Sequence, residues 1–357
     1  MRRNTDDQLK NETALSEEAK RKEKREKINE FFLNYSLYGV LGLLILIIII
    51  MEPSFLSLTN LTNILSQAST RVIIAMGAAG LIVLQGTDLS AGRVLGLSAV
   101  VGASLLQSPD FVSRMYPNLP QLPLIVPLIV ALSIGAVFGL INGFGVAVLK
   151  VHAFIITLGT QLIAYGLALI YIDRPPLGAQ PVGSLDKRYT SIVRGSFLIG
   201  KLQIPYLVLY AAAICVIMWI VWNKTTLGKN MFAIGGNPEA AEVSGVKVVQ
   251  NIMIVFLISG LLYGLGGFLE AARVGSVTSN TGLNYDLDAI SASVIGGVSF
   301  AGGVGSIPGV IIGALILQVI NYGLTFVGVN PYLQYIIRGL IIIIAVSIDV
   351  RKHIKKK

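Results

Sequence analysis

Long apolar runs recur along almost the whole chain, and they limit what it can fold into more than any other feature. A helix needs about 20 mostly apolar residues to cross the hydrocarbon core of a bilayer. The expected spans are 31–51, 60–84, 89–106, 124–149, 154–172, 206–222, 250–270, 286–299, 304–325 and 331–349. The boundaries of the third and eighth are the least clearly marked. These segments predict an all-α polytopic membrane protein with about ten transmembrane helices.

The composition supports a membrane protein rather than a soluble one. With 54% hydrophobic and 13% charged residues, the chain holds more apolar side chain than one soluble core can bury. Residues 1–30 carry nine Lys and Arg against eight Asp and Glu, and residues 351–357 carry five Lys and Arg, so these two tails hold +6 of the net +9. We therefore expect no nucleic-acid partner, and the basic tail is suited to anionic lipid, at about 1 kcal/mol per cation.

The order of these segments predicts the topology. We expect a charged cytoplasmic tail over 1–30, a transmembrane domain over 31–350 with halves at 31–222 and 251–350 joined by a hydrophilic segment at 223–250, and a basic cytoplasmic tail over 351–357. An even number of spans places both termini on one side, and the positive-inside rule selects the cytoplasm. The first apolar run begins too late for a cleavable signal peptide.

The segment 173–205 departs from this charge rule, because it would be external and yet carries five cations. They are Arg174, Lys187, Arg188, Arg194 and Lys201. Long segments cross membranes with weaker regard for charge, so the topology stands. The cations then indicate either a docking surface for an acidic external partner or an ordinary solvated loop.

Two similar stretches indicate an internal repeat. "TDLSAGRVLGLSAVVGA" begins at Thr87 and "YDLDAISASVIGGVSFAGG" begins at Tyr285, so their first aspartates are 198 positions apart. The expected helix starts comprise Asp88, Ser90, Arg93, Asp286 and Asp288. Asp88 or Ser90 would cap one helix, with Arg93 reaching toward the cytoplasmic interface. The two stretches open the third and eighth spans, an offset of five spans, so the repeats would have opposite orientation, as in many transporters; chance similarity is the alternative.

The hydrophilic segment "NKTTLGKNMFAIGGNPEAAEVSGVKVVQ" over 223–250 predicts a short capped helix. Asn237 is suited to the N-cap, Pro238 to the first helical position, and Gly245 to the stop. Such a helix is either a handle for mechanical work or a simple surface loop helix.

Residues that would support metal, disulfide or nucleotide chemistry are scarce. The chain has one cysteine, Cys215, and two histidines, His152 and His353, so it predicts neither an internal disulfide nor a metal site. No G-x-x-x-x-G-K-[ST] motif is present, so any nucleotide hydrolysis must come from another subunit.

The segment "AIGGNPEAAEVSGV" resembles the cytoplasmic coupling segment of the sugar-importing ABC permeases, the family of the ribose, xylose and galactose systems. "QGTDLSAGR", "FIITLGT", "DLDAISASVIGGVSFAGGVGS" and "INYGLTFVGVNPYLQYIIRG" extend the similarity over about 50–349. Within the family the galactose/methyl-galactoside type is the most similar, and ribose or another pentose is the alternative. The family usually has Pro where this chain has Ala153, so the start of the fifth span should be less sharply broken.

The resemblance implies a ten-helix permease similar to the vitamin B12 type, in the bacterial inner membrane. Its partners would be a second permease copy, a cytoplasmic ABC ATPase and an extracytoplasmic sugar-binding protein. This chain would bind no cofactor and would be no enzyme, because the ATPase uses the ATP and Mg. The coupling residues would be Gly235, Gly236, Asn237, Glu239, Ala240, Ala241 and Gly245.

Further polar residues are candidates for contact with sugar or with the binding protein. Gln85, Asn142, Gln161, Asn321 and Tyr322 are candidates for the sugar pathway, or for hydrogen bonds between helices. Arg174, Arg188 and Arg273 are candidates for docking the binding protein. Arg71 is either interfacial or pathway-lining. An ion-coupled secondary transporter and a scaffolding protein are the rival classes, although few ionisable residues lie within the spans.

Overall fold

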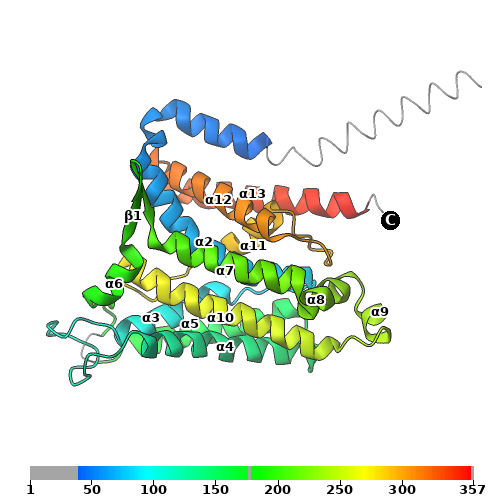
Figure 1. Ribbon diagram of the computed structural model, residues 1–357, viewed down its shortest axis with the longest axis horizontal. Coiled ribbons are helices and arrows are strands. Elements are labelled where there is room, and N and C mark those ends of the chain that lie inside the picture. The colour runs from blue at the N-terminus through cyan, green and yellow to red at the C-terminus, as the bar shows by residue number, and fades with distance from the viewer. Residues whose placement is uncertain (1–38, 176–177, 355–357) are drawn as a thin grey trace, which may run out of the picture.

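The computed structural model describes residues 39–175 and 178–354, and it is mainly helical (Figure 1). The described part begins with a helix at Gly39–Met51 and a 3-10 helix, η1, at Pro53–Leu56. The long helices are α2 (Leu58–Val83), α4 (Ile125–Ala147), α5 (Ala153–Ile172), α7 (Tyr206–Lys224), α10 (Val248–Val274), α12 (Ile307–Phe326) and α13 (Pro331–Ile354). The shorter ones are α3 (Ala91–Ser104), α6 (Lys187–Arg194), α8 (Thr226–Gly236), α9 (Pro238–Val243) and α11 (Tyr285–Ile295).

Seven helices in the described ranges are long and apolar enough to cross a membrane, so the expectation of a polytopic membrane protein is confirmed. Of the other three expected spans, 89–106 corresponds to α3, 286–299 to α11, and the described part of 31–51 to Gly39–Met51, while residues 31–38 lie outside the described residues. α3 has 14 residues and α11 has 11, which correspond to about 21 Å and 16 Å of helix. These lengths fall short of a hydrocarbon core of about 30 Å, so the number of ten crossings stays a prediction.

Each of the two short helices α3 and α11 follows a long helix after a break. α2, with 26 residues, is followed by the irregular segment 84–90 and α3; α10, with 27 residues, is followed by 275–284 and α11. Discontinuous helices of this kind place backbone groups and helix N-termini inside the membrane region of transporters. The same long-break-short pattern therefore occurs at both of the similar sequence stretches.

Close backbone approach joins α10 to α4. A Cβ atom added at Gly135 would lie 2.0 Å from the Gly260 carbonyl oxygen, and one added at Gly264 would lie 2.4 Å from that of Ala131. Only small residues allow membrane helices to approach this closely. Within lipid the hydrophobic effect does not drive helices together, so van der Waals contact between the closely packed backbones stabilises the pair. The two helices lie side by side along their length (Figure 1).

The segment 173–205, expected to be a loop, contains regular structure. It forms α6 and the antiparallel strands β1 (Ser196–Ile199) and β2 (Leu202–Pro205), so the all-α prediction needs this one correction. Gly200 has a φ of +63°, which permits the tight turn between the strands. In this segment the turn residues allow a hairpin to form, although the rest of the chain is helical.

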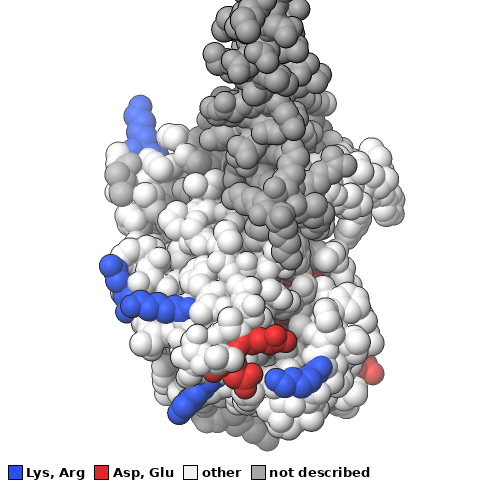
Figure 2. Space-filling view, turned by 90° about the vertical axis from the view of Figure 1, so that its right-hand side faces the viewer, with Lys and Arg blue, Asp and Glu red and all other residues white. Residues whose placement is uncertain are grey.

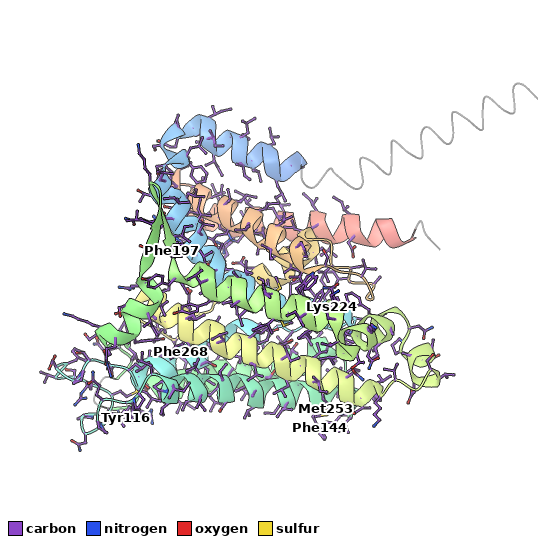
Figure 3. All side chains as sticks on the ribbon, in the orientation of Figure 1. Tyr116, Phe144, Phe197, Lys224, Met253 and Phe268 are labelled. Atoms are coloured by element: carbon purple, nitrogen blue, oxygen red, sulfur yellow. The ribbon has the colours of Figure 1, made fainter. Side chains whose placement is uncertain are left out.

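The polar ends of the molecule lie at opposite ends of the long helices. Figure 1 shows α6 at one end and α8 and α9 at the other. Tyr116 lies toward the α6 end and Lys224 lies nearer the α9 end (Figure 3). The Lys224 ammonium stacks on Trp219, 5.4 Å from the ring centroid, which suits an aromatic residue at a membrane interface.

The start of α5 is well defined despite the absence of Pro at Ala153. α5 begins at Ala153, and the His152 Nδ1 accepts a 3.3 Å hydrogen bond from the Phe154 amide. A histidine cap thus replaces the conformational restriction that a proline would provide. The predicted tail 1–30 lies outside the described residues, and residues 351–354 of the predicted C-terminal tail continue α13.

Candidate functional site

The short helix α9 forms as its sequence predicts. The Asn237 Oδ1 accepts a 3.0 Å hydrogen bond from the Ala240 amide, and Pro238 occupies the first turn. At the other end Gly245 has a φ of +85°, and the Val246 amide donates to the Ala241 carbonyl at 3.0 Å. A left-handed glycine with this bond pattern ends helices without a steric penalty. Hydrogen-bonded caps therefore define both ends of α9.

The outer face of α9 combines acids with an exposed apolar tip. Val243 is 91% exposed, and Glu239, Ala240, Glu242 and Gly245 are exposed as well. Ala241 is buried, so it supports the helix from within the protomer instead of contributing to its outer surface. Figure 2, which faces the end that carries α9, shows acidic side chains close to basic ones on a mostly uncharged surface. An almost fully exposed valine next to Glu242 suits contact with another protein.

Gln85, which follows α2, connects α8, the helix before α9, to the turn at 301–303. Its backbone is left-handed, with a φ of +61°, and its Nε2 donates to the Gly235 carbonyl at 2.8 Å and to the Ala301 carbonyl at 3.0 Å. The Gly303 amide also donates to the Val83 carbonyl at 2.9 Å. We name this contact of the α2 end, the α8 end and the 301–303 turn the glycine junction. The end of α8, which immediately precedes α9, is thus in contact with the end of α2 and with the α11–α12 connection.

Gly235 and Gly236 differ in this junction. A Cβ atom at Gly235 would lie 1.8 Å from the Val83 oxygen and 2.7 Å from the Gly303 nitrogen, whereas one at Gly236 would meet nothing within 4 Å. Gly235 is thus required for close packing, while Gly236 is exposed at the helix end.

Asp88 ends a chain of buried hydrogen bonds. Thr160 donates to the Asn142 Oδ1 at 2.7 Å, Asn142 donates to the Ser90 Oγ at 3.0 Å, and Ser90 donates to the Asp88 Oδ1 at 2.6 Å. The Ser90 amide also donates to this carboxylate at 2.8 Å. These bonds tie the start of α3 to α4 and α5, so Asn142 takes its alternative role as a residue that links helices.

Arg93 points away from the expected cytoplasmic interface. Its Nη1 donates to the Ser279 carbonyl at 3.1 Å, and its guanidinium stacks on Tyr165, 4.0 Å from the ring centroid. Ser279 follows the end of α10 that lies opposite to α9.

Charged residues of α2, α10 and α11 form one buried network. Arg71 pairs with Asp288 and stacks on Tyr285 at 4.5 Å. Arg273 donates to both carboxylate oxygens of Glu270 at 2.6 and 2.8 Å, and Tyr285 donates to the same carboxylate at 2.6 Å. Mutual neutralisation is what permits four charges to remain here. Arg71 is thus a paired residue, and Arg273 is engaged internally. Asp286 is buried in the first turn of α11.

Tyr322 and Asn321, two further pathway candidates, also join helices. Tyr322 donates to the Asn60 Oδ1 at 2.8 Å, and Asn321 accepts from Arg338 at 3.0 Å. Gln161 is half-buried. A sugar-contacting role for these residues stays a prediction.

The cationic candidates for docking lie at the α6 end. Arg174 stacks on Tyr171 at 3.8 Å and donates to the Tyr116 hydroxyl at 2.8 Å. Arg188 remains half-exposed and pairs with Asp186 at 2.7 Å. Hydrogen bonds from Arg188 lower the pKa of Asp186 to about 2. Arg188 is therefore accessible, whereas Arg174 is committed to its aromatic neighbours; docking by any of the three stays a prediction.

Several residues of these contacts were not singled out from the sequence. They are Val243, Glu242, Thr160 and the 301–303 turn. Two adjacent glycines at 302–303 were a usable signal for a tight turn in the sequence. In the structure both have a positive φ, and Gly302 approaches the Gly235 carbonyl closely. Among the described residues, no group of three or more His, Cys, Asp and Glu is placed to hold a metal ion.

Comparison with known proteins places the chain in a family. The family described as "Branched-chain amino acid transport system / permease component" matches residues 60–346. The chain belongs to this family of ABC transporter permeases, and the sequence-based resemblance to sugar ABC permeases is confirmed. The class is thus a multi-pass membrane subunit of a transport system.

Individual proteins of known name differ in how similar they are to the chain. The chain is 52% identical to the galactose/methyl galactoside import permease protein MglC of Haemophilus influenzae and 52% identical to MglC of Escherichia coli, each over 82% of this chain and 87% of the relative. It is 36% identical to the ribose import permease protein RbsC of Escherichia coli, over 81% of this chain and 85% of the relative. No solved structure matches.

Proposed function

We propose that this protein is the membrane-spanning subunit of an ATP-driven importer of galactose or methyl galactoside. The observation that carries the proposal is the capped, exposed helix α9, held to α2 and the 301–303 turn by Gln85 in a chain 52% identical to galactose permeases. The protein itself binds no cofactor; a separate cytoplasmic ABC ATPase uses ATP and Mg²⁺, and an extracytoplasmic binding protein delivers the sugar.

In this mechanism the ATPase acts on the Val243 tip of α9. Two caps keep α9 from fraying, so a displacement moves the helix as a unit and passes through Gly235 to Gln85 and the 301–303 turn. The movement changes the arrangement of α2 and α11, and a pathway formed with a second permease copy alternates between outward and inward access. The sugar is translocated without chemical change.

The proposed topology follows from the placement of α6 and α9. Ten crossings, including Gly39–Met51, α3 and α11, would put α9 and both termini in the cytoplasm and α6 outside. The two halves, with their long-break-short helices, would have opposite orientation, as in the vitamin B12 type of permease. The location is the bacterial inner membrane.

Reconstitution with the ATPase and the binding protein tests this function. We expect ATP-dependent uptake of galactose and methyl galactoside in preference to ribose. Preferential ribose uptake would favour the ribose-type alternative. Uptake that continued without ATPase and followed an ion gradient would contradict an ABC importer.

A substitution at Gly245 tests the role of α9. Gly245→Arg places a long cation beside the exposed α9 surface, and we expect loss of transport with normal membrane insertion. Gly245→Asn is the matched control, because Asn tolerates the same left-handed backbone without adding charge. Equal uptake by both variants would remove α9 from the coupling mechanism.

A further inference from the structure

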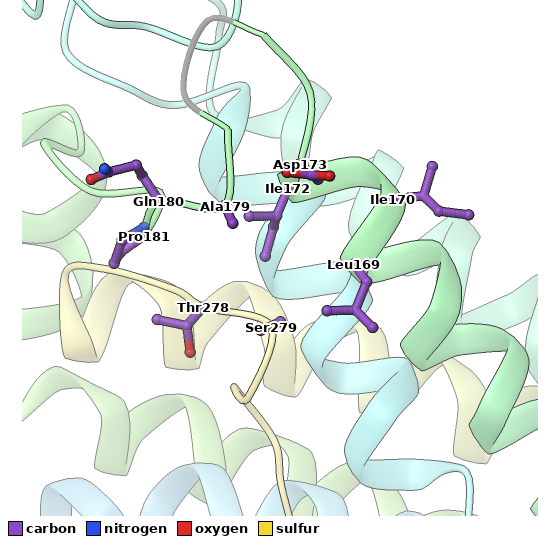
Figure 4. Close-up of a pocket in the computed structure, with 9 residues that line it drawn as sticks. All are labelled: Leu169, Ile170, Ile172, Asp173, Ala179, Gln180, Pro181, Thr278 and Ser279. Carbon is purple, nitrogen blue, oxygen red and sulfur yellow. The ribbon is translucent and has the colours of Figure 1, made fainter.

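A pocket of about 370 Å³ opens at the α6 end of the molecule. It lies between the last turn of α5, residues 179–181 and residues 278–279 (Figure 4). This end is opposite to α9, so in the proposed topology the pocket faces the outside. We name it the outer pocket.

The walls of the outer pocket are held in place by the protein. Val182 and Val277 form an isolated antiparallel bridge, with amide-to-carbonyl hydrogen bonds of 2.9 and 3.0 Å. This bridge adjoins Pro181 on one wall and Thr278 on the other. The pocket is thus preformed, which lowers the ordering cost of binding a small ligand.

The lining combines hydroxyl-binding groups with an apolar wall. Asp173 and Gln180 supply a carboxylate and an amide, Thr278 and Ser279 supply hydroxyls, and Leu169 and Ile172 supply the apolar side. Within the described ranges, the side chains of Asp173, Gln180 and Ser279 make no hydrogen bond to the protein. A monosaccharide has hydroxyl edges that need such partners and C–H faces that pack on aliphatic side chains.

Polar and aromatic groups continue below the outer pocket. Arg93 donates to the Ser279 carbonyl at 3.1 Å and stacks on Tyr165 at 4.0 Å. Tyr165 lies seven residues before Ile172 on α5, a rise of about 10 Å. Gln161, one turn further along α5, is half-buried, as Arg93 and Tyr165 are. The line from Ser279 to Gln161 therefore leads from the pocket into the membrane region.

We propose that the outer pocket is the subsite of the permease that first receives the monosaccharide released at the outer face. This inference rests on the proposed function and assigns residues to its first transport step. The Asp173 carboxylate accepts hydrogen bonds from sugar hydroxyls, the Gln180 amide accepts and donates them, and the sugar then moves past Arg93 and Tyr165, which lie below the pocket.

Cysteine protection tests the proposal directly. In a Cys215→Ala background, Ser279→Cys and Gln180→Cys are placed in the pocket, and Asn118→Cys is the control on an exposed loop at the same end. The complete permease–ATPase complex is labelled with a membrane-impermeant maleimide, with galactose or with mannitol as the osmotic control. We expect galactose to slow labelling at positions 279 and 180 several-fold and to leave position 118 unchanged. Equal labelling rates with galactose and mannitol, up to the solubility of the sugar, would overturn the proposal.

Transport kinetics separate a sugar subsite from a docking surface. We expect Asp173→Asn to lower the maximal uptake rate by about tenfold, equivalent to about 1.4 kcal/mol, with unchanged affinity for the loaded binding protein. Asp110→Asn, an exposed acid outside the pocket, should behave as the unmodified protein. A weaker affinity for the binding protein with an unchanged maximal rate would overturn the sugar subsite and assign Asp173 to docking. Failure of the unmodified complex to transport any sugar would instead defeat the proposed function, and the protection result would stand apart from it.

Discussion

The glycine junction yields a sharp prediction, because two adjacent glycines differ in what surrounds them. Gly235→Ala would place a Cβ atom 1.8 Å from the Val83 oxygen and 2.7 Å from the Gly303 nitrogen. Ordinary carbon–oxygen contact requires about 3.5 Å, so the backbone segments must separate. Gly236→Ala meets nothing within 4 Å and gains helix propensity of up to about 1 kcal/mol.

The expected cost of Gly235→Ala follows from the contacts that must shift. Forcing an extra methyl group into a packed site costs about 1–3 kcal/mol. Separation also weakens the bonds from Gly303 to Val83 and from Gln85 to Gly235, at about 1 kcal/mol each. A total of about 3 kcal/mol corresponds to a roughly 100-fold loss in the population of the closed junction.

The assay compares the two alanine variants in the reconstituted transporter. We expect Gly235→Ala to hydrolyse ATP with the binding protein present while transporting little sugar, whereas Gly236→Ala transports normally. Thermal stability of the purified permease gives a second measurement, with Gly235→Ala the less stable of the two. Equal transport and equal stability for the two variants would refute the junction as a mechanical contact.

Three further predictions follow from other contacts. Asn237→Ala removes the α9 cap and should lower the stability of this helix by about 1 kcal/mol, so less sugar should be taken up per ATP hydrolysed. Asn237→Asp keeps a side-chain acceptor and should transport normally. An equal defect in the Asp variant would count against capping as the role of Asn237. Arg273→Glu should reduce the yield of folded protein, because it sets a second acid against buried Glu270, whereas Lys201→Glu, at an exposed position, should fold normally; good yield for Arg273→Glu would argue that the buried network is dispensable. The pKa of Asp186 is lowered to about 2 from 3.8, so its stabilising effect is complete above about pH 4 and is lost as the pH falls toward 2. Between pH 4 and 2, the stability of Asp186→Asn should therefore depend less on pH than that of the unmodified protein, as measured by thermal unfolding, and identical profiles would contradict the assignment.

The sequence predicted local features better than contacts between distant segments. Asn237, Pro238 and Gly245 define α9 through bonds within a few residues, so the pattern alone located this helix. The apolar runs similarly located the long helices. Gln85 shows the limit, because its partners Gly235 and Ala301 are 150 and 216 residues away and no local rule connects them.

The positions of charged side chains in the fold were the hardest feature to predict from the sequence. Arg273 is near the end of a helix, which indicates an accessible cation, yet Glu270 one turn earlier holds it inside the protein. Arg93 likewise stacks on Tyr165 instead of reaching toward the expected cytoplasmic interface. A long side chain reaches several ångströms, so its partner depends on packing that is set by distant parts of the chain.

The backbone contact between α4 and α10 has a consequence for movement. At Gly135, Gly139, Gly260 and Gly264 the two backbones face each other with no side chain in between that could change rotamer as the helices slide. Displacement along the helix axis would drive one backbone into the other, so the pair must travel as a rigid block. Spin labels on the exposed faces of α4 and α10 should keep a constant separation through the whole cycle, which makes this pair a fixed reference frame for measuring the motion of every other helix.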